Sequence, residues 1–299
     1  MTGARVVRPI PGKTLRRMPA APARMLKLGP LEHRLGTRTL IMGILNVTPD
    51  SFSDGGRYAA VEAAAAHARE MVAAGAAIID VGGESTRPGA TEVGAEDELA
   101  RVLPALEAIA PGCAVPISID TYKAAVAEAA LAAGASVVND VWGLQREPEI
   151  AAVAARHRAG VVIMHNRGEV DATLDILAEV RRFFLKSLLI AERAGIPDDR
   201  IVLDPGIGFG KTLEQNVELL ARLDELRAIG LPILVGASRK SLIGRLLDQP
   251  IADRLPGTLA THVLAVAGGA DIVRVHDVAA HVQALRIADV ICRGGEQAS

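Results

Sequence analysis

The chain has 299 residues, of which 50% are hydrophobic and 23% are charged, and its formal net charge at pH 7 is -2. A chain of this length and apolar content can bury a large core, and one α/β barrel of about 250 residues would use most of it. The charge provides no field for a nucleic acid, and no apolar run reaches the roughly 20 residues that span a bilayer. Neither a nucleic acid nor a membrane is therefore an expected partner.

Basic residues and prolines dominate the amino-terminal region. Residues 1–35 lack the continuous apolar centre of a secretory signal, and we expect a basic, flexible arm there, followed by one barrel domain over residues 36–299. Cys113 and Cys292 are too few for a disulfide framework and lie far from any metal-ligand spacing. This cysteine usage favours a reducing, cytoplasmic compartment.

Short apolar runs alternate with Ala- and Leu-rich segments along the rest of the chain. The predicted strands are 40–45, 77–81, 115–119, 136–138, 161–164, 201–203, 233–235 and 272–275. The predicted helices are 59–74, 96–110, 122–133, 150–158, 174–194, 213–229, one that begins near Ser241, 258–267 and 278–292. Eight strand–helix units favour a closed (β/α)8 TIM barrel over an open doubly wound sheet, which rarely needs eight regular repeats.

Two long polar loops follow the first two predicted strands. The first, NVTPDSFSDGG over residues 46–56, offers hydroxyls, carboxylates and bare amides, and the second is GGESTRPG over residues 82–89. A plain surface connection would have no use for Phe52, because aromatic residues make up only 2% of the chain. The first loop is therefore interpreted as a ligand-binding loop.

Polar residues also stand at the carboxyl ends of other predicted strands. In a barrel these ends point at one mouth, so we expect the following side chains to converge: Asn46, Asp120, Asn139, Asp204, Lys240, Arg274 and His276. They could form only a salt-bridge plug, but buried pairs give little stability over apolar packing, which favours a ligand site. Carboxylates, amides and cations of this kind suit a flat heterocycle, phosphate oxygens and a divalent cation.

Seven motifs occur in one order between Met42 and Asp277: MGILNVTPDSFSDGG, DVGGESTRPGA, SIDT, NDV, DPGIGFGK, SRKS and RVHD. Together they closely resemble the dihydropteroate synthases, and the two long loop motifs carry most of the specificity. The resemblance implies a (β/α)8 transferase of folate biosynthesis, the sulfonamide target, and a homodimer. Such an enzyme joins 6-hydroxymethyl-7,8-dihydropterin diphosphate to 4-aminobenzoate and releases pyrophosphate in the presence of Mg²⁺.

The resemblance also implies roles for individual residues. The pterin would be held by Asp120, Asn139, Asp204 and Lys240, with Arg274 stacked on its ring. Asn46 would lie by the metal and the diphosphate. Arg274 and His276 would bind the diphosphate anion, and Thr86 and Arg87 would approach the substrate on the second loop. The aminobenzoate would be framed by Phe52, Pro88 and Phe209, with Ser241 near its carboxylate. The residues expected to act in catalysis are Asn46, Asp120, Lys240 and Arg274.

Leaving-group departure is expected to precede attack by the amine, because the electron-rich dihydropterin can spread positive charge while cations and amides take up the negative charge. Two other functions compete with this one. A pterin-dependent methyltransferase domain of the same barrel family has no use for diphosphate loops, and a non-catalytic pterin-binding paralogue would not need the complete set of site residues. One departure is Asn166, which stands where this family has an apolar residue in the pocket wall at the fifth strand.

Overall fold

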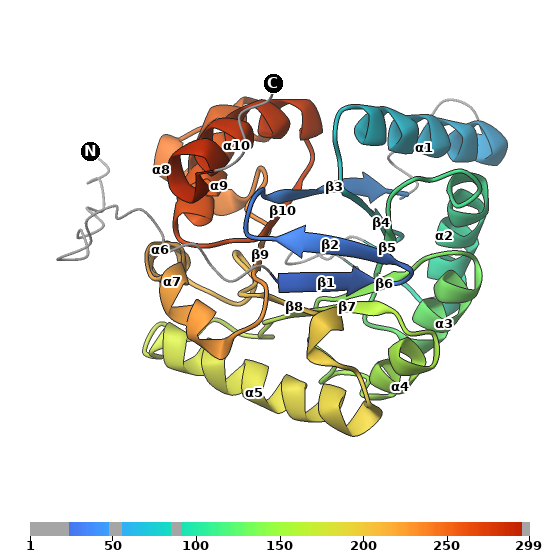
Figure 1. Ribbon diagram of the computed structural model, residues 1–299, viewed down its shortest axis with the longest axis horizontal. Helices are drawn as coiled ribbons and strands as arrows, with labels where there is room; N and C mark the ends of the chain where they lie inside the picture. Colours follow the sequence, from blue (N-terminus) through green and yellow to red (C-terminus); the bar gives the residue numbers. More distant parts are fainter. Residues whose placement is uncertain (1–23, 48–55, 85–90, 295–299) are drawn as a thin grey trace.

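A computed structural model describes residues 24–47, 56–84 and 91–294, with the backbone alone for residues 56–58 (Figure 1). Four residues with predicted roles, Phe52, Thr86, Arg87 and Pro88, lie outside the described residues, as does the first part of the expected arm, residues 1–23.

Eight parallel strands form the centre of the molecule. They are β3 (Leu40–Asn46), β4 (Ile78–Gly82), β5 (Ile117–Asp120), β6 (Val137–Asp140), β7 (Gly160–Met164), β8 (Ile201–Asp204), β9 (Leu234–Val235) and β10 (Ile272–Val275). Their spatial order is β8-β7-β6-β5-β4-β3-β10-β9, and a parallel bridge between Leu203 and Ile233 joins the two ends of this series. The predicted (β/α)8 barrel is confirmed.

Helices surround this barrel (Figure 1). They are α1 (Gly56–Ala73), α2 (Ala95–Ile109), α3 (Ala124–Ala132), α4 (Glu149–Arg156), α5 (Ile176–Ala194), α6 (Leu213–Ala221), α7 (Leu223–Leu226), α8 (Ser241–Leu247), α9 (Leu255–Ala267) and α10 (Val278–Arg293), with short 3₁₀ turns η2 (Asp198–Arg200), η3 (Arg227–Ile229) and η4 (Ile251–Asp253). The helix predicted over residues 213–229 is wrong in one respect. It is interrupted at Arg222, whose backbone leaves the helical region and whose guanidinium bonds Glu218 and Glu225 across the break.

An antiparallel hairpin, β1 (Arg24–Leu28) and β2 (Leu31–Leu35), lies across one end of the barrel (Figure 1). Its buried leucines pack against the residues at or near the start of the barrel strands, namely Leu40, Met42, Ile78, Val137, Val162, Val202, Leu234 and Ile272. The flexible arm expected through residue 35 is therefore wrong for residues 24–35. Leu26 and Leu28 alternate with Lys27 in the period of a strand, and this pattern is obscured by the basic composition around it.

The turn of the hairpin depends on Gly29. This residue has φ +65°, and a Cβ built there would lie 2.4 Å from Cβ of Ser136, so the hairpin approaches the barrel at a distance that only glycine allows. Because the hairpin covers the amino ends of the strands, their polar carboxyl ends are left at the opposite mouth. None of the helices in the described ranges is long and apolar enough to cross a membrane.

Candidate active site

Arg274 of β10 ties together two aspartates at the carboxyl mouth. Its Nε donates to Oδ2 of Asp80 at 2.6 Å, and its Nη2 donates to Oδ2 of Asp120 at 2.7 Å. Nδ2 of Asn139 also donates to Oδ2 of Asp80, at 3.1 Å. Both aspartates are buried, whereas the side chain of Arg274 is 19% exposed. One cation thus fixes two carboxylates from neighbouring strands and still reaches the solvent side.

Strand register explains why these side chains meet. Asn46, Gly82, Asp120 and Asn139 are paired in sequence across β3, β4, β5 and β6, so they form one row around the mouth. This row of side chains has a gap at Gly82, which has none. A Cβ built there would lie 3.7 Å from Oδ2 of Asp120 and 3.8 Å from Oδ1 of Asn46, so these two oxygens flank a position without a side chain.

Asp204 enters the mouth from the other side. Its Oδ1 accepts a hydrogen bond from the backbone N–H of Gly206 at 2.7 Å. A Cβ built at Gly236 would lie 3.9 Å from Oδ2 of Asp204 and 3.9 Å from Cδ of Arg274, so the carboxylate and the arginine stem face each other across this glycine. Lys240 donates to the carbonyl of Ile207, and its Nζ lies 4.5 Å from the centroid of the Phe209 ring.

Burial shifts the pKa values of these groups in the direction that favours their uncharged forms. Desolvation raises the pKa of Asp120 to about 7, although Arg274 opposes the shift, and desolvation also raises the pKa of Asp204. Desolvation lowers the pKa of Lys240 to about 8, against the attraction of Asp204. Perturbed titrating groups gathered in one mouth are typical of a functional site.

A purely structural salt-bridge network would pair Asp120 and Asp204 with Arg274 and Lys240, and among the described residues it is formed only in part. Arg274 does pair with Asp120, but in the described part of the chain no ion pair joins Asp204 to Lys240. Within the same ranges, Oδ1 of Asp80 and Oδ1 of Asp120 are buried acceptors without a hydrogen-bond partner. A network built only for stability would leave few such acceptors, because each one costs about 1–3 kcal/mol. The orphan oxygen of Asp120 favours a ligand that brings its own donors.

The glycine-rich segment after β8 is organised by Lys211, which the sequence reasoning did not single out. Its Nζ donates to the carbonyls of Gly206 at 2.8 Å and Phe209 at 2.9 Å, with that of His165 at 3.4 Å. Gly206 has φ +65°, and a Cβ there would lie 1.9 Å from the His165 carbonyl. With three carbonyls around it, Lys211 holds the loop that carries Phe209 rather than reaching a ligand.

An apolar wall completes the mouth. Tyr122, Val141 and Met164 form a buried cluster, against which Phe209 and Trp142 pack. The contribution of the fifth barrel strand to this wall is thus Met164. The unexpected Asn166 lies beyond it and accepts a hydrogen bond from the backbone N–H of Arg167 at 2.7 Å.

Of the two remaining described candidates, His276 is partly buried and Ser241 is exposed. His276 follows β10, and its Nδ1 is 3.0 Å from the Ser238 hydroxyl. Ser241 is the first residue of α8 and is exposed. Sequence reasoning also missed Asp80, although a carboxylate inside the apolar run AIIDV requires a buried partner and was in principle a usable signal.

Comparisons with known proteins agree with this geometry. Residues 42–276 match the family described as pterin binding enzymes. The chain is 47% identical over 269 residues to the dihydropteroate synthase of Clostridium beijerinckii, with 90% of this chain and 100% of that protein covered.

Two crystal structures are similar to the whole barrel. Dihydropteroate synthase from Clostridium difficile in the presence of pteroic acid has a TM-score of 0.84 and 51% identity, over 87% of this chain and 98% of that one. The Xanthomonas albilineans enzyme with 4-aminobenzoic acid also has a TM-score of 0.84, with 47% identity over 89% and 97% of the two chains.

A TIM barrel whose carboxyl mouth presents buried carboxylates, an amide and cations beside an apolar wall defines a pterin-binding enzyme of the transferase class. Within that class, the identity and the near-complete coverage place the chain in the dihydropteroate synthase family.

Proposed function

We propose that this protein condenses 6-hydroxymethyl-7,8-dihydropterin diphosphate with 4-aminobenzoate to give 7,8-dihydropteroate and pyrophosphate. The observation that carries the proposal is the meeting of Asp120, Asn139, Asp204 and Lys240 at one mouth, with a buried acceptor of Asp120 left for a ligand. Relatives solved with pteroic acid and with 4-aminobenzoic acid support the same pair of substrates.

The pterin ring fits between the carboxylates and the apolar wall. Its amide-like edge carries adjacent N–H donors, which match the carboxylate oxygens of Asp204 and the orphan Oδ1 of Asp120. Asn139 and Lys240 provide donors for the ring nitrogens and carbonyl. The partly exposed guanidinium of Arg274 is held flat by its two aspartates and can stack on the ring face.

A divalent cation fits this mouth only together with a substrate. Among the residues that the structure describes, no group of three or more His, Cys, Asp or Glu side chains could hold a metal ion. Oδ1 of Asn46 and Oδ2 of Asp120 nevertheless both lie beside Gly82, and Mg²⁺ is commonly held by one or two protein oxygens plus substrate phosphates. When bound, Mg²⁺ would neutralise negative charge on the departing diphosphate.

The protein groups then support a reaction in which the leaving group departs first. Arg274 and His276 bind the anion as the bond from the pterin methylene to the diphosphate stretches. Asp120, whose charge faces the ring, stabilises the cation that develops on the pterin. The neutral aromatic amine attacks the methylene afterwards and loses its proton, so no covalent enzyme intermediate is required.

The direct test is to mix the purified protein with the pterin diphosphate, MgCl₂ and 4-aminobenzoate, and to follow pyrophosphate release. We expect release that depends on the amine and stops when EDTA removes the metal. Release without the amine would indicate a hydrolase, and pterin binding without any release would indicate the non-catalytic alternative.

We also propose a homodimer, supported by apolar side chains on α8, α9, α10 and η4. Six of them are at least 48% exposed: Leu246, Leu247, Ile251, Leu264, Ile287 and Ile291. These helices are neighbours on one side of the barrel (Figure 1), and exposed apolar side chains on neighbouring helices are typical of a two-fold interface. Free Cys113 and Cys292 fit the proposed cytoplasmic location.

Sedimentation velocity tests the dimer. Ile291→Glu places a charge on the proposed interface, so we expect it to sediment as a monomer where the unmodified protein sediments as a dimer. Leu185→Glu is the matched control, because Leu185 is 60% exposed on α5, away from these helices. A dimer that survives Ile291→Glu, or that Leu185→Glu dissociates, contradicts the assignment of the face.

A further inference from the structure

Asp80 is a buried carboxylate whose contact with Asn139 has no part in the function proposed above. It lies on β4, and its side chain is fully buried. Its Oδ2 accepts hydrogen bonds from two residues of the mouth, namely from Nε of Arg274 at 2.6 Å and from Nδ2 of Asn139 at 3.1 Å. These partners are 194 and 59 positions away in the chain. One oxygen therefore joins β4 to both β10 and β6.

The place of Asp80 on its strand puts it directly below the polar row of the mouth. Successive side chains of a strand alternate between its faces, so Ile78, Asp80 and Gly82 share one face of β4. Ile78 belongs to the apolar packing at the amino end, and Gly82 ends the strand without a side chain. Asp80 is therefore the last side chain of β4 on this face, at the boundary between the apolar interior and the mouth.

The carboxylate determines which way the amide of Asn139 faces. A carboxylate paired with a guanidinium accepts hydrogen bonds and does not donate them. The amide atom beside Asp80 must therefore be Nδ2, and Oδ1 must lie on the other side of the amide. Nδ2 carries a second hydrogen, which is a suitable donor for a ring nitrogen. An amide without the carboxylate beside it could turn over and present its carbonyl oxygen instead.

The plane of the Arg274 guanidinium depends on the same carboxylate. Its Nε is bound to Asp80 and its Nη2 is bound to Asp120, so two atoms of a rigid planar group are held in place. Asp80 thus contacts both the cation proposed to stack on the ring and the amide proposed to bind its edge.

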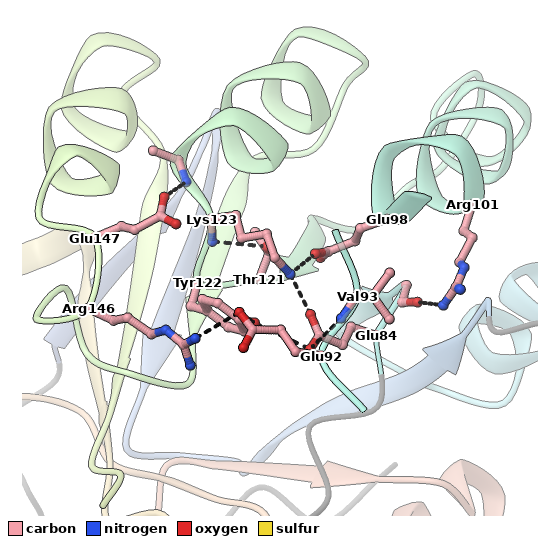
Figure 2. A network of polar contacts seen from close by, with 12 residues as sticks. Glu84, Glu92, Val93, Glu98, Arg101, Thr121, Tyr122, Lys123, Arg146 and Glu147 are labelled. Atoms are coloured by element: carbon pink, nitrogen blue, oxygen red, sulfur yellow. Dashed lines mark hydrogen bonds and ion pairs between the residues drawn. The ribbon is translucent and has the colours of Figure 1, made fainter. Parts of the chain in front are cut away.

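Stability alone does not explain Asp80. Within the described residues its Oδ1 is a buried acceptor without a hydrogen-bond partner, and well-packed apolar residues often serve stability as well as buried ions do. Another buried ion cluster shows the difference: Lys123 pairs with Glu84 and Glu98, neither of which is among the expected ring-binding residues (Figure 2). Both hydrogen-bond partners of Asp80 belong to that set.

We propose that Asp80 is a positioning residue that sets which heterocycle the mouth accepts: it holds the N–H side of Asn139 in place and so selects a ring nitrogen that accepts a hydrogen bond. This inference rests on the proposed function. N1 of a 2-amino-4-oxopteridine is such an acceptor, whereas N1 of a 2,4-dioxopteridine carries a hydrogen and would oppose the amide donor. A site built for one pattern rejects the other, because a buried donor is left unpaired.

Two variants remove the constraint. Asp80→Asn keeps the size of the side chain, but its amide can donate as well as accept, so Asn139 is no longer held in one orientation. Asp80→Ala is made in parallel, because it places no new donor opposite Arg274 and so remains informative if Asp80→Asn does not fold.

Asp289→Asn is the matched control. Asp289 is also a buried aspartate that pairs with an arginine and with a second donor: Nε of Arg293 lies 3.0 Å from its Oδ1, and the N–H of Thr39 donates to its Oδ2 at 2.7 Å. It lies on α10, and Thr39 precedes β3 at the amino end of the barrel. The control therefore loses a comparable carboxylate far from the carboxyl mouth.

Three measurements decide the result. The ratio of the Kd for 6-hydroxymethyllumazine to that for 6-hydroxymethylpterin, measured by calorimetry, should fall at least five-fold in both Asp80 variants. In an Asn139→Ala background, adding Asp80→Ala should change this ratio less than two-fold, because no amide is left to orient. Solvent exchange of the Arg274 Nε–H, followed by NMR in the ligand-free protein, should become at least ten-fold faster in both Asp80 variants.

Asp289→Asn should leave the Kd ratio and the exchange rate within two-fold of those of the unmodified protein. A Kd ratio that stays within two-fold in the Asp80 variants, an equal fall in the Asn139→Ala background, an unchanged exchange rate or an equal effect of Asp289→Asn would each overturn the positioning role. None of these measurements needs turnover. If the unmodified protein bound the pterin but released no pyrophosphate, the proposed condensation would fail, while the Kd ratio would still decide the role of Asp80.

Discussion

At the scale of single residues, the mouth depends on carboxylates kept in apolar surroundings. Asp204 shows both the loss of hydration that burial imposes on a carboxylate and the free acceptor that burial leaves for a ligand. Burial raises the pKa of Asp204. Its Oδ1 already accepts a hydrogen bond from Gly206, whereas its Oδ2 lies beside Gly236, close to the stem of Arg274, and is left for a ligand. A ligand edge with two adjacent N–H groups would recover the lost hydration.

Replacing Asp204 should therefore weaken pterin binding strongly. Asp204→Ala removes a charge-assisted hydrogen-bond acceptor, which corresponds to a Kd increase of about 100-fold for a loss near 3 kcal/mol. Asp198→Ala, an exposed aspartate in η2, should leave the Kd unchanged. Calorimetry with the pterin measures both, and retained affinity in Asp204→Ala would remove this residue from the edge-recognition site.

Residue roles were only partly predictable from the sequence. Asp120, Asn139 and Asp204 stand at strand ends, where periodicity alone places them at one mouth. Asp80 was missed because its partner is distant in sequence, and Lys211 was missed because its role depends on the folded backbone of its own loop. Asp80 is paired with Arg274, 194 positions away, and Lys211 is held by carbonyls whose direction is set by the backbone of the folded loop.

At the scale of elements, two buried histidines connect α9 and α10 to the chain between β9 and α8. The Ala237 N–H donates to Nε2 of His262 at 3.0 Å, so the proton of neutral His262 is on Nδ1. That nitrogen lies 2.9 Å from Nε2 of His281, whose Nδ1 donates to the Asp277 carbonyl at 2.7 Å. Every ring nitrogen has one partner, and the hydrogen bonds run in one direction.

Protonation would break this series, because it would place a donor opposite a donor. Burial lowers the pKa of His262 and of His281, so the unfolded chain binds more protons than the folded one below about pH 6.5. Their contribution to stability is complete above that pH and is lost as the pH falls towards the folded pKa. Each histidine then contributes a slope of about 1.4 kcal/mol per pH unit.

Urea unfolding at pH 8.0 and pH 5.5 measures this slope. His262→Gln should be less stable at pH 8.0 but should lose about 1 kcal/mol less than the unmodified protein on acidification. His67→Gln, at a side chain that is 48% exposed, is the control and should behave as the unmodified protein does. Equal losses in His262→Gln and the unmodified protein would show that the pair does not titrate on unfolding.

At the scale of the whole molecule, the barrel was predictable because eight apolar runs recur with helices between them, and only parallel pairing buries such strands on both faces. The hairpin was not predictable by the same reasoning. Its strands are short and lie in a stretch rich in basic residues and prolines, so composition indicated an arm. The alternating leucines predict a strand only if a buried surface lies next to them, and the amino end of the barrel provides that surface.

Leu28 tests whether the hairpin is part of the core. The side chain is 1% exposed and packs at the barrel end, so Leu28→Ala should reduce the free energy of unfolding by about 2–5 kcal/mol. Leu31→Ala, in the same hairpin but 38% exposed, should cost about 0.5 kcal/mol or less. Denaturant unfolding gives both values, and the pterin Kd should not change. A small loss in Leu28→Ala would exclude the hairpin from the cooperative core.

The hairpin also has a kinetic consequence. It covers the end of a barrel whose interior is already filled by packed side chains, so the carboxyl mouth is the open end, where Asp120 and Asp204 are buried and Ser241 is exposed. If both substrates use this mouth, we expect the one that binds beside Asp120 and Asp204 to enter before the one that binds nearer to Ser241. A molecule bound near Ser241 alone would then have to leave before the deeper substrate could enter.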